Sequence, residues 1–268
     1  MKIVIIIAFL SLSKIGTSQI LDSINIKCVY RLTYSMDSNN VNQKSYDTKV
    51  LEIGNHSSKY YSLERYKGDS ILNADIEKGV SMGEIIANKF KYQKDKSSFK
   101  IYQNFPLGMM SVTEDIGQLY QYSEDNIAQN WQIQSDTQTV FGILCQKAIT
   151  GFRGRNYTAW FTNTIPVMFG PWKFNGLPGL ILKISDSQNH YVFECINIQD
   201  GKLLPLRGFE KSDFIKITRK EMRKLLLQKF EDPLGSFQGN SNGVSVIFGD
   251  SNLAIPKRPY NPIEKTYD

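Results

Sequence analysis

Residues 142–162 read GILCQKAITGFRGRNYTAWFT, and this stretch predicts the fold class of the chain. Its two parts, 142–149 and 156–162, are rich in apolar, aromatic and β-branched residues, which are typical of strands. The intervening residues 152–155 (FRGR) suit a short hairpin loop. Two strands joined by so short a loop must run antiparallel, because a parallel pair needs a long crossover connection.

Other parts of the chain repeat this pattern. Residues 24–34 alternate between apolar and polar or smaller side chains, which indicates a long strand with one buried face. Strand-like runs at 179–185 and 191–198 are separated by a turn sequence, and one further strand is predicted at 244–248. Consecutive strands with short turns indicate a meander. We therefore predict a mainly β (α+β) fold, a curved antiparallel sheet or half-barrel with one or two packing helices.

One helix is predicted at 219–230. Thr218 and Glu221 match a capping box, in which each side chain accepts a hydrogen bond from a free backbone N–H of the first turn. The apolar stripe of this helix consists of Met222, Leu225 and Leu226, and its other face carries Arg219, Lys220 and Arg223. A solvated face over a packed stripe is one interpretation, and attachment to an acidic surface is the other.

The amino-terminal end has the three parts of a secretory signal peptide. Lys2 gives a basic start, an apolar run of roughly ten residues follows, and the small residues Gly16 and Ser18 precede Gln19. We expect residues 1–18 to be a cleaved signal and residues 19–268 to form a single β-rich domain. The mature protein is then periplasmic or secreted, with no transmembrane helix, because no later apolar run approaches the roughly twenty residues needed to span a bilayer.

The composition limits the class of protein. Hydrophobic residues make up 41% of the chain and aromatic residues 12%, which is typical of a globular protein rather than a disordered one. The formal net charge is +6 and is spread along the chain, so we expect no nucleic-acid partner. No sequence pattern implies a cofactor.

Three cysteines, Cys28, Cys145 and Cys195, permit one disulfide in an exported protein. Cys145 and Cys195 both fall in predicted strands, and a bridge between them would link strands or layers. The alternative interpretation is three small buried thiols, since free cysteine usually behaves as an apolar residue.

The chain offers few catalytic candidates. Residues 79–83 (GVSMG) match G-x-S-x-G, the turn that presents a nucleophilic serine in α/β-hydrolases, and would make Ser81 the nucleophile. The preceding residues are charged, whereas that turn needs an apolar strand before it. His56 and His190 lack partners at metal-ligand spacing, so no metal site is predicted. Two pairs of adjacent acidic residues, Glu114 with Asp115 and Glu124 with Asp125, are interpreted as solvated surface charge.

Residues 170–182 read GPWKFNGLPGLIL and combine glycine, proline and large apolar side chains. Pro178 and Gly179 suit a type II turn, with positive φ at Gly179. Residues 180–182 then predict a strand covered on both faces. The connection before them is long for neighbouring strands, and Trp172 and Phe174 could plug the core.

These residues resemble the GLPGLI family of exported proteins of Gram-negative bacteria, named after the motif Gly176, Leu177, Pro178, Gly179, Leu180 and Ile181. The resemblance also covers 145–148, 152–162, 165–166, 170–174, Asp186 and 260–264 (YNPIE). Because that family has no settled biochemical activity, the resemblance implies a compartment and no reaction. A half-barrel like that of the periplasmic lipoprotein carriers would fit the strand order by analogy.

We expect a non-enzymatic envelope protein whose curved sheet wraps an apolar groove, closed by the helix and by the loop at 163–179. The ligand would be hydrophobic or extended, such as a lipid, a lipoprotein or a peptide. The candidate ligand-binding residues are Arg153, Arg155, Trp160, Trp172, Lys173 and Phe174. The alternatives are an exported serine hydrolase using Ser81, and an envelope protein-interaction module using the basic helix.

Overall fold

A computed structural model of the chain describes residues 19–92, 97–209, 214–231 and 260–266. The predicted signal peptide at 1–18 and the predicted strand at 244–248 lie outside these residues. None of the helices within the described ranges is long and apolar enough to cross a membrane.

Strands are the predominant regular structure of the described residues. The strands are β1 (Ile20–Ser23), β2 (Ile26–Tyr34), β3 (Ser45–Ile53), β4 (Ser58–Ser62), β5 (Lys100–Gln103), β6 (Met109–Asp115), β7 (Leu119–Asp125), β8 (Gln132–Val140), β9 (Ile143–Phe152), β10 (Arg155–Thr162), β11 (Leu180–Asp186), β12 (Tyr191–Asp200), β13 (Pro205–Arg207) and β14 (Ile215–Lys216). β1 pairs with β13, and the other strands of the described residues form one sheet in the order β14-β7-β6-β5-β4-β3-β2-β12-β11-β10-β9-β8.

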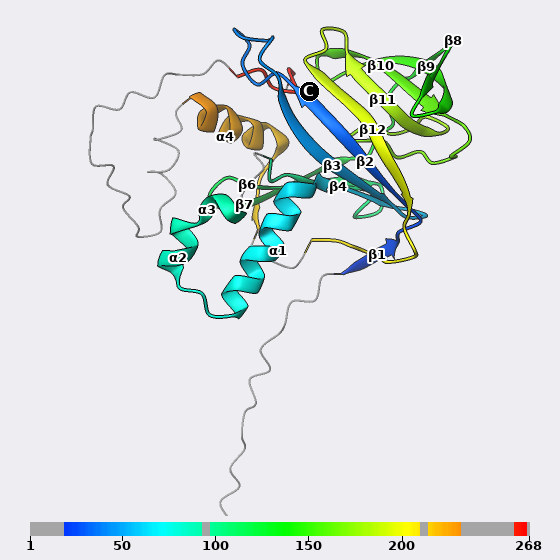
Figure 1. Cartoon of the computed structure of the whole chain (residues 1–268). Helices are drawn as coiled ribbons and strands as arrows, with labels where there is room; N and C mark the ends of the chain where they lie inside the picture. The colour runs from blue at the N-terminus through cyan, green and yellow to red at the C-terminus, as the bar shows by residue number, and fades with distance from the viewer. Residues whose placement is uncertain (1–18, 93–96, 210–213, 232–259, 267–268) are drawn as a thin grey trace, which may run out of the picture.

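The large sheet is built from two meanders. The strands from β2 to β7 form the first and those from β8 to β12 form the second, and the pairing of β12 with β2 joins them. Every neighbouring pair is antiparallel except β14 with β7. Figure 1 shows that the sheet is strongly curved and open. The predicted fold class, a curved antiparallel sheet resembling a half-barrel, is confirmed.

The helices lie beside the first meander (Figure 1). α1 (Leu63–Glu77), α2 (Met82–Ala87) and α3 (Lys89–Tyr92) are inserted between β4 and β5, and α4 (Arg219–Glu231) follows β14. In α4 the capping box is formed as predicted, because Thr218 N–H donates to the Glu221 carboxylate at 2.7 Å and Glu221 N–H donates to Thr218 Oγ1 at 3.2 Å.

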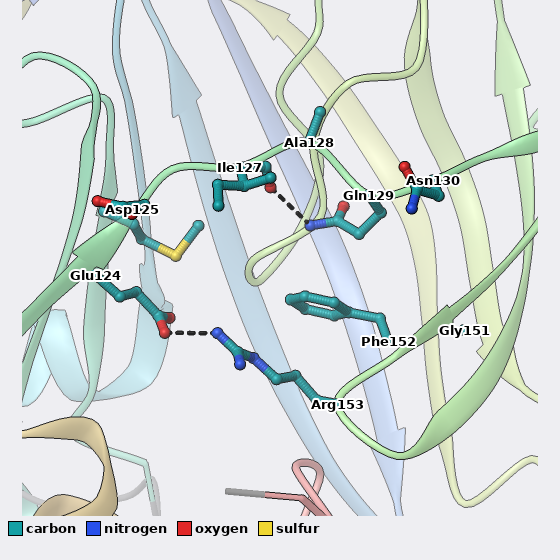
Figure 2. Close-up of a pocket in the computed structure, with 10 residues that line it drawn as sticks. Glu124, Asp125, Ile127, Ala128, Gln129, Asn130, Gly151, Phe152 and Arg153 are labelled. Carbon is teal, nitrogen blue, oxygen red and sulfur yellow. Dashed lines mark hydrogen bonds and ion pairs between the residues drawn. The ribbon is translucent and has the colours of Figure 1, made fainter. Parts of the chain in front are cut away.

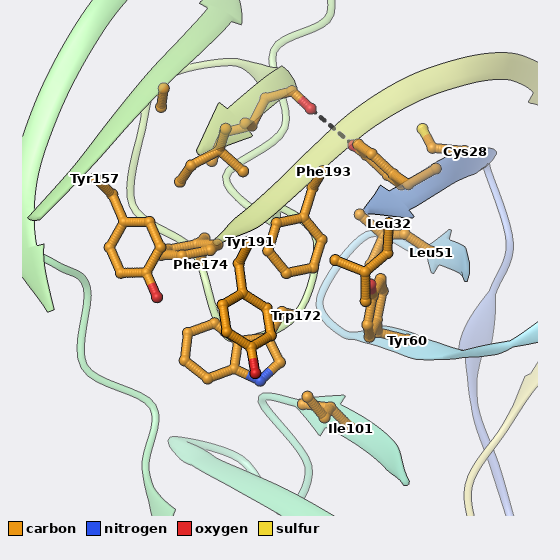
Figure 3. Close-up of a cluster of buried hydrophobic side chains, with 14 of the residues drawn as sticks. Cys28, Leu32, Leu51, Tyr60, Ile101, Tyr157, Trp172, Phe174, Tyr191 and Phe193 are labelled. Atoms are coloured by element: carbon orange, nitrogen blue, oxygen red, sulfur yellow. Dashed lines mark hydrogen bonds between the residues drawn. The ribbon is translucent and has the colours of Figure 1, made fainter. Parts of the chain in front are cut away.

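The core lies in the concavity of the sheet. β11 contributes Leu180, Ile181 and Leu182, which are all buried, so the prediction of a strand covered on both faces is confirmed. The hydroxyl of Tyr30 on β2 donates to the Ile181 carbonyl at 2.8 Å. Figure 3 shows how Phe174 lies between Tyr157 and Phe193 in this core. The loop that carries Phe174 therefore determines what the concave face can bind.

Candidate ligand-binding site

The loop between β10 and β11 folds back over the concave face as a compact hairpin. Gly170 N–H donates to the Phe174 carbonyl at 2.8 Å, and Gly176 N–H donates to the Met168 carbonyl at 2.9 Å. The buried amide of Gln103 on β5 donates to the carbonyls of Trp172 at 3.1 Å and Phe174 at 3.3 Å. Since Gln103 belongs to the first meander, the loop connects the two halves of the sheet.

Two aromatic side chains of this loop plug the core, as predicted. The side chain of Phe174 is fully buried, and its ring centroid lies 4.8 Å from that of Tyr157 and 5.1 Å from that of Trp172. Trp172 also meets Phe152 edge-on at 5.7 Å. The apolar groove that we expected under this loop is therefore filled by the protein's own side chains, and the expectation of an open groove there is wrong.

The turn before β11 differs from the predicted type II turn. Gly176 adopts positive φ (+88°), whereas Gly179 is not among the described residues with positive φ. Gly179 is instead required by space, because a Cβ there would lie 2.0 Å from the Thr162 carbonyl oxygen. Both positions therefore require glycine, Gly176 because of its backbone conformation and Gly179 because no space is left for a side chain.

Lys173 lies in a buried ionic network and not at an open site. Its ammonium group donates to Tyr122 Oη at 2.8 Å, to Glu124 Oε1 at 2.6 Å and to Glu264 Oε1 at 2.6 Å. Burial by itself would lower the pKa of Lys173, but Tyr122, Glu264 and Glu124 outweigh it and raise the pKa above its ordinary value. Lys173 is therefore charged and holds the loop against β7 and the carboxyl-terminal segment.

Arg219 of α4 completes this network. It contacts Glu264 at 2.7 Å and Glu124 at 3.4 Å, and Arg223 donates to the carbonyls of Glu264 and Thr266. Two of the three cations considered for surface attachment thus hold the described carboxyl-terminal residues. Glu124, interpreted from the sequence as solvated, is in fact the shared carboxylate of the network, so that interpretation is wrong. It is also wrong for Glu114, which is buried.

Arg155 clamps the carboxyl-terminal segment 260–266. Its buried guanidinium pairs with Asp186 at 2.9 Å and donates to the carbonyls of Pro262 at 2.6 Å and Ile263 at 3.0 Å. It also donates to Asn261 Oδ1 at 2.7 Å. The YNPIE sequence is thus an internal partner of Arg155, and the guanidinium has no place in an open ligand site.

Trp160 is separated from the other candidates. On β10, Tyr157 and Ala159 are both buried, and Tyr157 lies beside Phe174 in the core. Side chains alternate between the two faces of a strand, so the residue after Ala159 lies on the other face. Trp160 therefore faces the outer side of the sheet, where it lies in register between Lys147 on β9 and Lys183 on β11.

Arg153 does line a cavity. Arg153 and Gly154 both have positive φ, which makes a two-residue hairpin turn between β9 and β10. The cavity has a volume of about 270 Å³, and its lining residues are Met110, Glu124, Asp125, Ile127, Ala128, Gln129, Asn130, Gly151, Phe152 and Arg153.

The cavity lies between the β9–β10 turn and the segment leading into β8. Figure 2 shows Ile127 and Gln129 on one side and Phe152 and Arg153 on the other. Arg153 donates to Glu124 Oε2 at 2.6 Å, and its guanidinium carbon lies 5.2 Å from the centre of the Phe152 ring. Of the six candidates, the structure places only Arg153 at this cavity. No sequence spacing connects residues 124–130 with 151–153, so sequence reasoning missed most of the lining.

The other site predictions are resolved by local geometry. Ser81 is exposed, follows α1 and not a strand, and accepts a hydrogen bond from Glu84 N–H at 3.3 Å at the start of α2. The interpretation of Ser81 as an elbow nucleophile is therefore wrong. Among the described residues, no three or more histidine, cysteine or acidic side chains gather in a way that could hold a metal ion.

All three cysteines are free, buried thiols. The disulfide between Cys145 and Cys195 is not formed, because β10 and β11 lie between the strands that carry them. Burial raises the pKa of Cys195 to about 11, so its thiol is unreactive near neutral pH.

Comparisons with known proteins support the fold and give no activity. A family model described as "Protein of unknown function (Porph_ging)" matches residues 150–183, which include the turn with Arg153, β10 and the plugging loop. A search of curated proteins found no significant match.

Two of the similar solved structures are crystal forms of PNGF-II. The form in space group C2 has a TM-score of 0.51, 13% identity, and covers 78% of this chain and 34% of that one. The second crystal form has a TM-score of 0.48, 14% identity, and coverages of 75% and 33%.

An uncharacterized conserved protein from Thermus thermophilus has a TM-score of 0.37, 7% identity, and coverages of 74% and 91%. In the comparison with PNGF-II, by contrast, this chain spans only about a third of the length of the matched chain. At this identity the likeness concerns the fold alone.

Proposed function

We propose that this chain is an exported, non-catalytic binding protein of the GLPGLI family that adds an extended polypeptide as a strand to the β8 edge of its sheet. The observation that carries the proposal is the state of β8. It is the last strand in the sheet order, and among the described residues only β9 pairs with it.

β8 is unusually exposed for a strand of nine residues. Only Val140 is buried, and most of the other side chains on both faces are exposed. An unpaired strand edge presents a row of free N–H and C=O groups that can pair with another chain. At the opposite edge of the sheet, β14 has only two residues. β8 therefore offers the longer template for strand addition.

Exposed apolar side chains lie on β8 and on the segments that adjoin it. They are Ile127 (70% exposed), Ile133 (48%), Phe141 (50%), Leu144 (65%) and Met168 (65%). Ile133 is on β8, Leu144 is on its hairpin partner β9, and Phe141 lies in the turn between them. A chain laid along β8 would cover part of this surface, which favours an interaction site over a merely solvated edge.

An extended polypeptide fits better than a lipid. The concave face under the loop is filled by Trp172 and Phe174, and the cavity of about 270 Å³ is below the range of roughly 300–1,000 Å³ usual for sites that enclose a drug-sized ligand. A second copy fits less well than a different chain. Antiparallel self-pairing centred on β8 would place Asp136 opposite its copy, and like charges directly opposite each other are destabilising.

The proposal is tested by amide-resolved hydrogen exchange with two pools of synthetic peptides of about twelve residues. One pool alternates β-branched and polar residues, and the matched pool carries proline at every second polar position. β8 pairs with β9 in regular register over residues 137–140, and its register shifts between Ile133 and Thr137. In the regular part, the first pool is expected to protect the amides that point away from β9, and the proline pool is expected to leave them unprotected.

Two neighbouring variants, Gln138→Pro and Thr139→Pro, identify the edge that is used. Of two adjacent residues one amide faces β9 and the other faces outward. The variant that keeps global stability should lose the peptide-induced protection. Equal protection by both pools, or protection confined to residues away from β8, would contradict strand addition. Protection of β8 with dimer formation in the absence of peptide would show that the partner is a second copy.

A further inference from the structure

Residues 260–266 lie against the rest of the protein without joining its sheet. Figure 1 shows this segment in red, beside the loop that follows β2. The segment forms no helix or strand, and Tyr260 makes an isolated bridge with Asp37. The surface that holds it, which we call the segment groove, consists of Arg155, Lys173, Tyr191, Arg219, Arg223 and the backbone carbonyls of residues 35 and 36.

The segment groove pairs both ends of the Asn261 amide. The side-chain oxygen of Asn261 accepts from Arg155 at 2.7 Å, and its side-chain nitrogen donates to the Ser35 carbonyl at 2.9 Å. Its backbone N–H donates to the Met36 carbonyl at 2.8 Å, and its carbonyl accepts from the Tyr191 hydroxyl at 2.6 Å. An amide is the group that accepts from a guanidinium and donates to a carbonyl at the same time, so the groove selects asparagine here.

The segment groove also binds the carboxylate of Glu264. Oε1 of Glu264 lies 2.6 Å from the Lys173 ammonium, and Oε2 lies 2.7 Å from the Arg219 guanidinium. Burial alone would raise the pKa of Glu264, but the two cations outweigh it and hold the pKa below its ordinary value. Arg223 donates to the Glu264 carbonyl at 2.7 Å, so this residue is held by its side chain and its backbone.

The cations of the segment groove are held in place by contacts that do not involve the segment. Arg155 pairs with Asp186 at 2.9 Å. Lys173 and Arg219 both contact Glu124, at 2.6 Å and 3.4 Å. These five side chains carry three positive and two negative charges, so they need one more carboxylate for balance. The groove is therefore pre-organised for a peptide that supplies an acidic side chain.

The covalent connection to the segment is long. α4 ends at Glu231, and residues 232–259 separate it from Tyr260. A chain of that length can span at most roughly 90 Å when fully extended. The groove of one molecule is therefore within reach of the segment of a neighbouring molecule.

We propose that the segment groove is a recognition site for the peptide sequence Asn-Pro-x-Glu, and that it accepts this sequence from a second copy of the chain as well as from its own residues 261–264. This sequence is the occupant whose fit the structure shows. An exchange between two copies keeps every contact of the groove and changes only which chain supplies the segment. The inference goes beyond strand addition and does not depend on it, because none of these contacts involves β8.

The test uses the full chain with a protease site inserted within residues 232–259. The folded protein is cleaved, which removes the advantage that covalent attachment gives to its own segment. A fluorescently labelled synthetic peptide with the sequence of residues 257–268 is then added. We expect the peptide to replace the cleaved fragment and to show raised fluorescence anisotropy, while the far-UV circular dichroism stays that of the uncut protein.

Matched peptides test which side chains are recognised. Asn261→Ala and Glu264→Gln peptides should each bind at least about tenfold more weakly, because each loses a charge-assisted hydrogen bond of about 1.5–3 kcal/mol. Lys265→Ala is the control, since its exposed ammonium lies 3.4 Å from Gln188 outside the groove, and it should not weaken binding. A peptide of the same composition in scrambled order should not bind.

A second arm tests the second copy with uncleaved chains. Glu264→Gln has an intact groove and a weakened segment, whereas Arg219→Ala has a weakened groove and an intact segment. When the two variants are mixed at high concentration, native mass spectrometry should show a heterodimer that exceeds the homodimers of either variant alone. The intact segment gains the Arg219 contact only by entering the groove of the other chain.

The remaining outcomes overturn the inference. Equal binding of the scrambled peptide shows that only net charge is sensed. Unfolding of the cleaved protein as its fragment leaves shows that the segment is part of the fold and not a ligand. Peptide binding without a heterodimer refutes the second copy as the source of the segment. None of these results changes the protection of β8 amides, so the proposed function is tested separately.

Discussion

Replacing Arg155 by alanine should strongly destabilise the protein. The Arg155–Asp186 pair is almost completely buried, with each side chain 2% exposed, and three acceptors of residues 261–263 depend on the same guanidinium. Removing one member of a buried pair leaves an uncompensated charge and costs about 3–5 kcal/mol. For a chain of this size, that corresponds to a fall in Tm of about 6–20 °C, at roughly 2–4 °C per kcal/mol.

The assay is equilibrium denaturation in urea, with a double-mutant cycle. In Arg155→Ala/Asp186→Asn the buried charge is gone, while the amide oxygen at 186 can still accept the Tyr191 N–H that Asp186 accepts at 2.7 Å. The double variant should therefore be more stable than Arg155→Ala alone, by about 1–3 kcal/mol. Arg31→Ala serves as the matched control, because the Arg31–Glu194 pair is 53% and 34% exposed and should contribute less than about 1 kcal/mol.

Two results would refute the reasoning about Arg155. One is a loss below about 1 kcal/mol in Arg155→Ala, which would show that the clamp on the carboxyl-terminal segment is not formed. The other is equal stability of the single and double variants, which would show that the charge of Asp186 is not the cause.

Three further predictions follow from burial and space. Burial raises the pKa of Glu114 from 4.5 to about 7, so the free energy of unfolding falls as the pH rises through this range and the carboxyl ionises. Glu114→Gln should therefore stabilise the protein by up to about 3 kcal/mol near pH 8.5 and not near pH 4. Urea titrations that show the same gain in stability at both pH values would contradict this. Gly179→Ala should cost at least about 2 kcal/mol by thermal denaturation, because its Cβ would meet the Thr162 carbonyl, whereas Gly83→Ala, with open space around it, should be neutral or stabilising. A thiol reagent near neutral pH should label none of the three cysteines in the native protein and all of them after denaturation, and rapid native labelling of Cys195 would show that it is not buried.

Local sequence signals predicted much of the second meander. The strand pattern of 142–162, the turn at 152–155 and the fully apolar start of β11 all appear in the structure. The plugging role of Trp172 and Phe174 was also predictable, since a long connection with two large aromatic residues must place them somewhere. These features were accessible because they depend on neighbours in the chain.

The ionic partners could not be predicted. Arg155 and Asp186 are 31 positions apart, Lys173 and Glu124 are 49 apart, and Arg155 and Asn261 are 106 apart. Local patterning indicates that a residue is charged and lies near strands, but not which distant carboxylate neutralises it. Four of the six candidate residues (Arg155, Trp172, Lys173 and Phe174) are therefore structural, and only Arg153 lies at the cavity.

The sequence by itself determined the antiparallel strands, the cap of α4 and the aromatic loop, because alternation, capping and turn formation act within a few residues. Only the tertiary structure decided that β12 pairs with β2, that the loop fills the concave face and that β8 is left at the edge. The physical reason is that these outcomes depend on which distant segments exclude water from one another, and a one-dimensional pattern shows that a face is apolar without identifying what covers it.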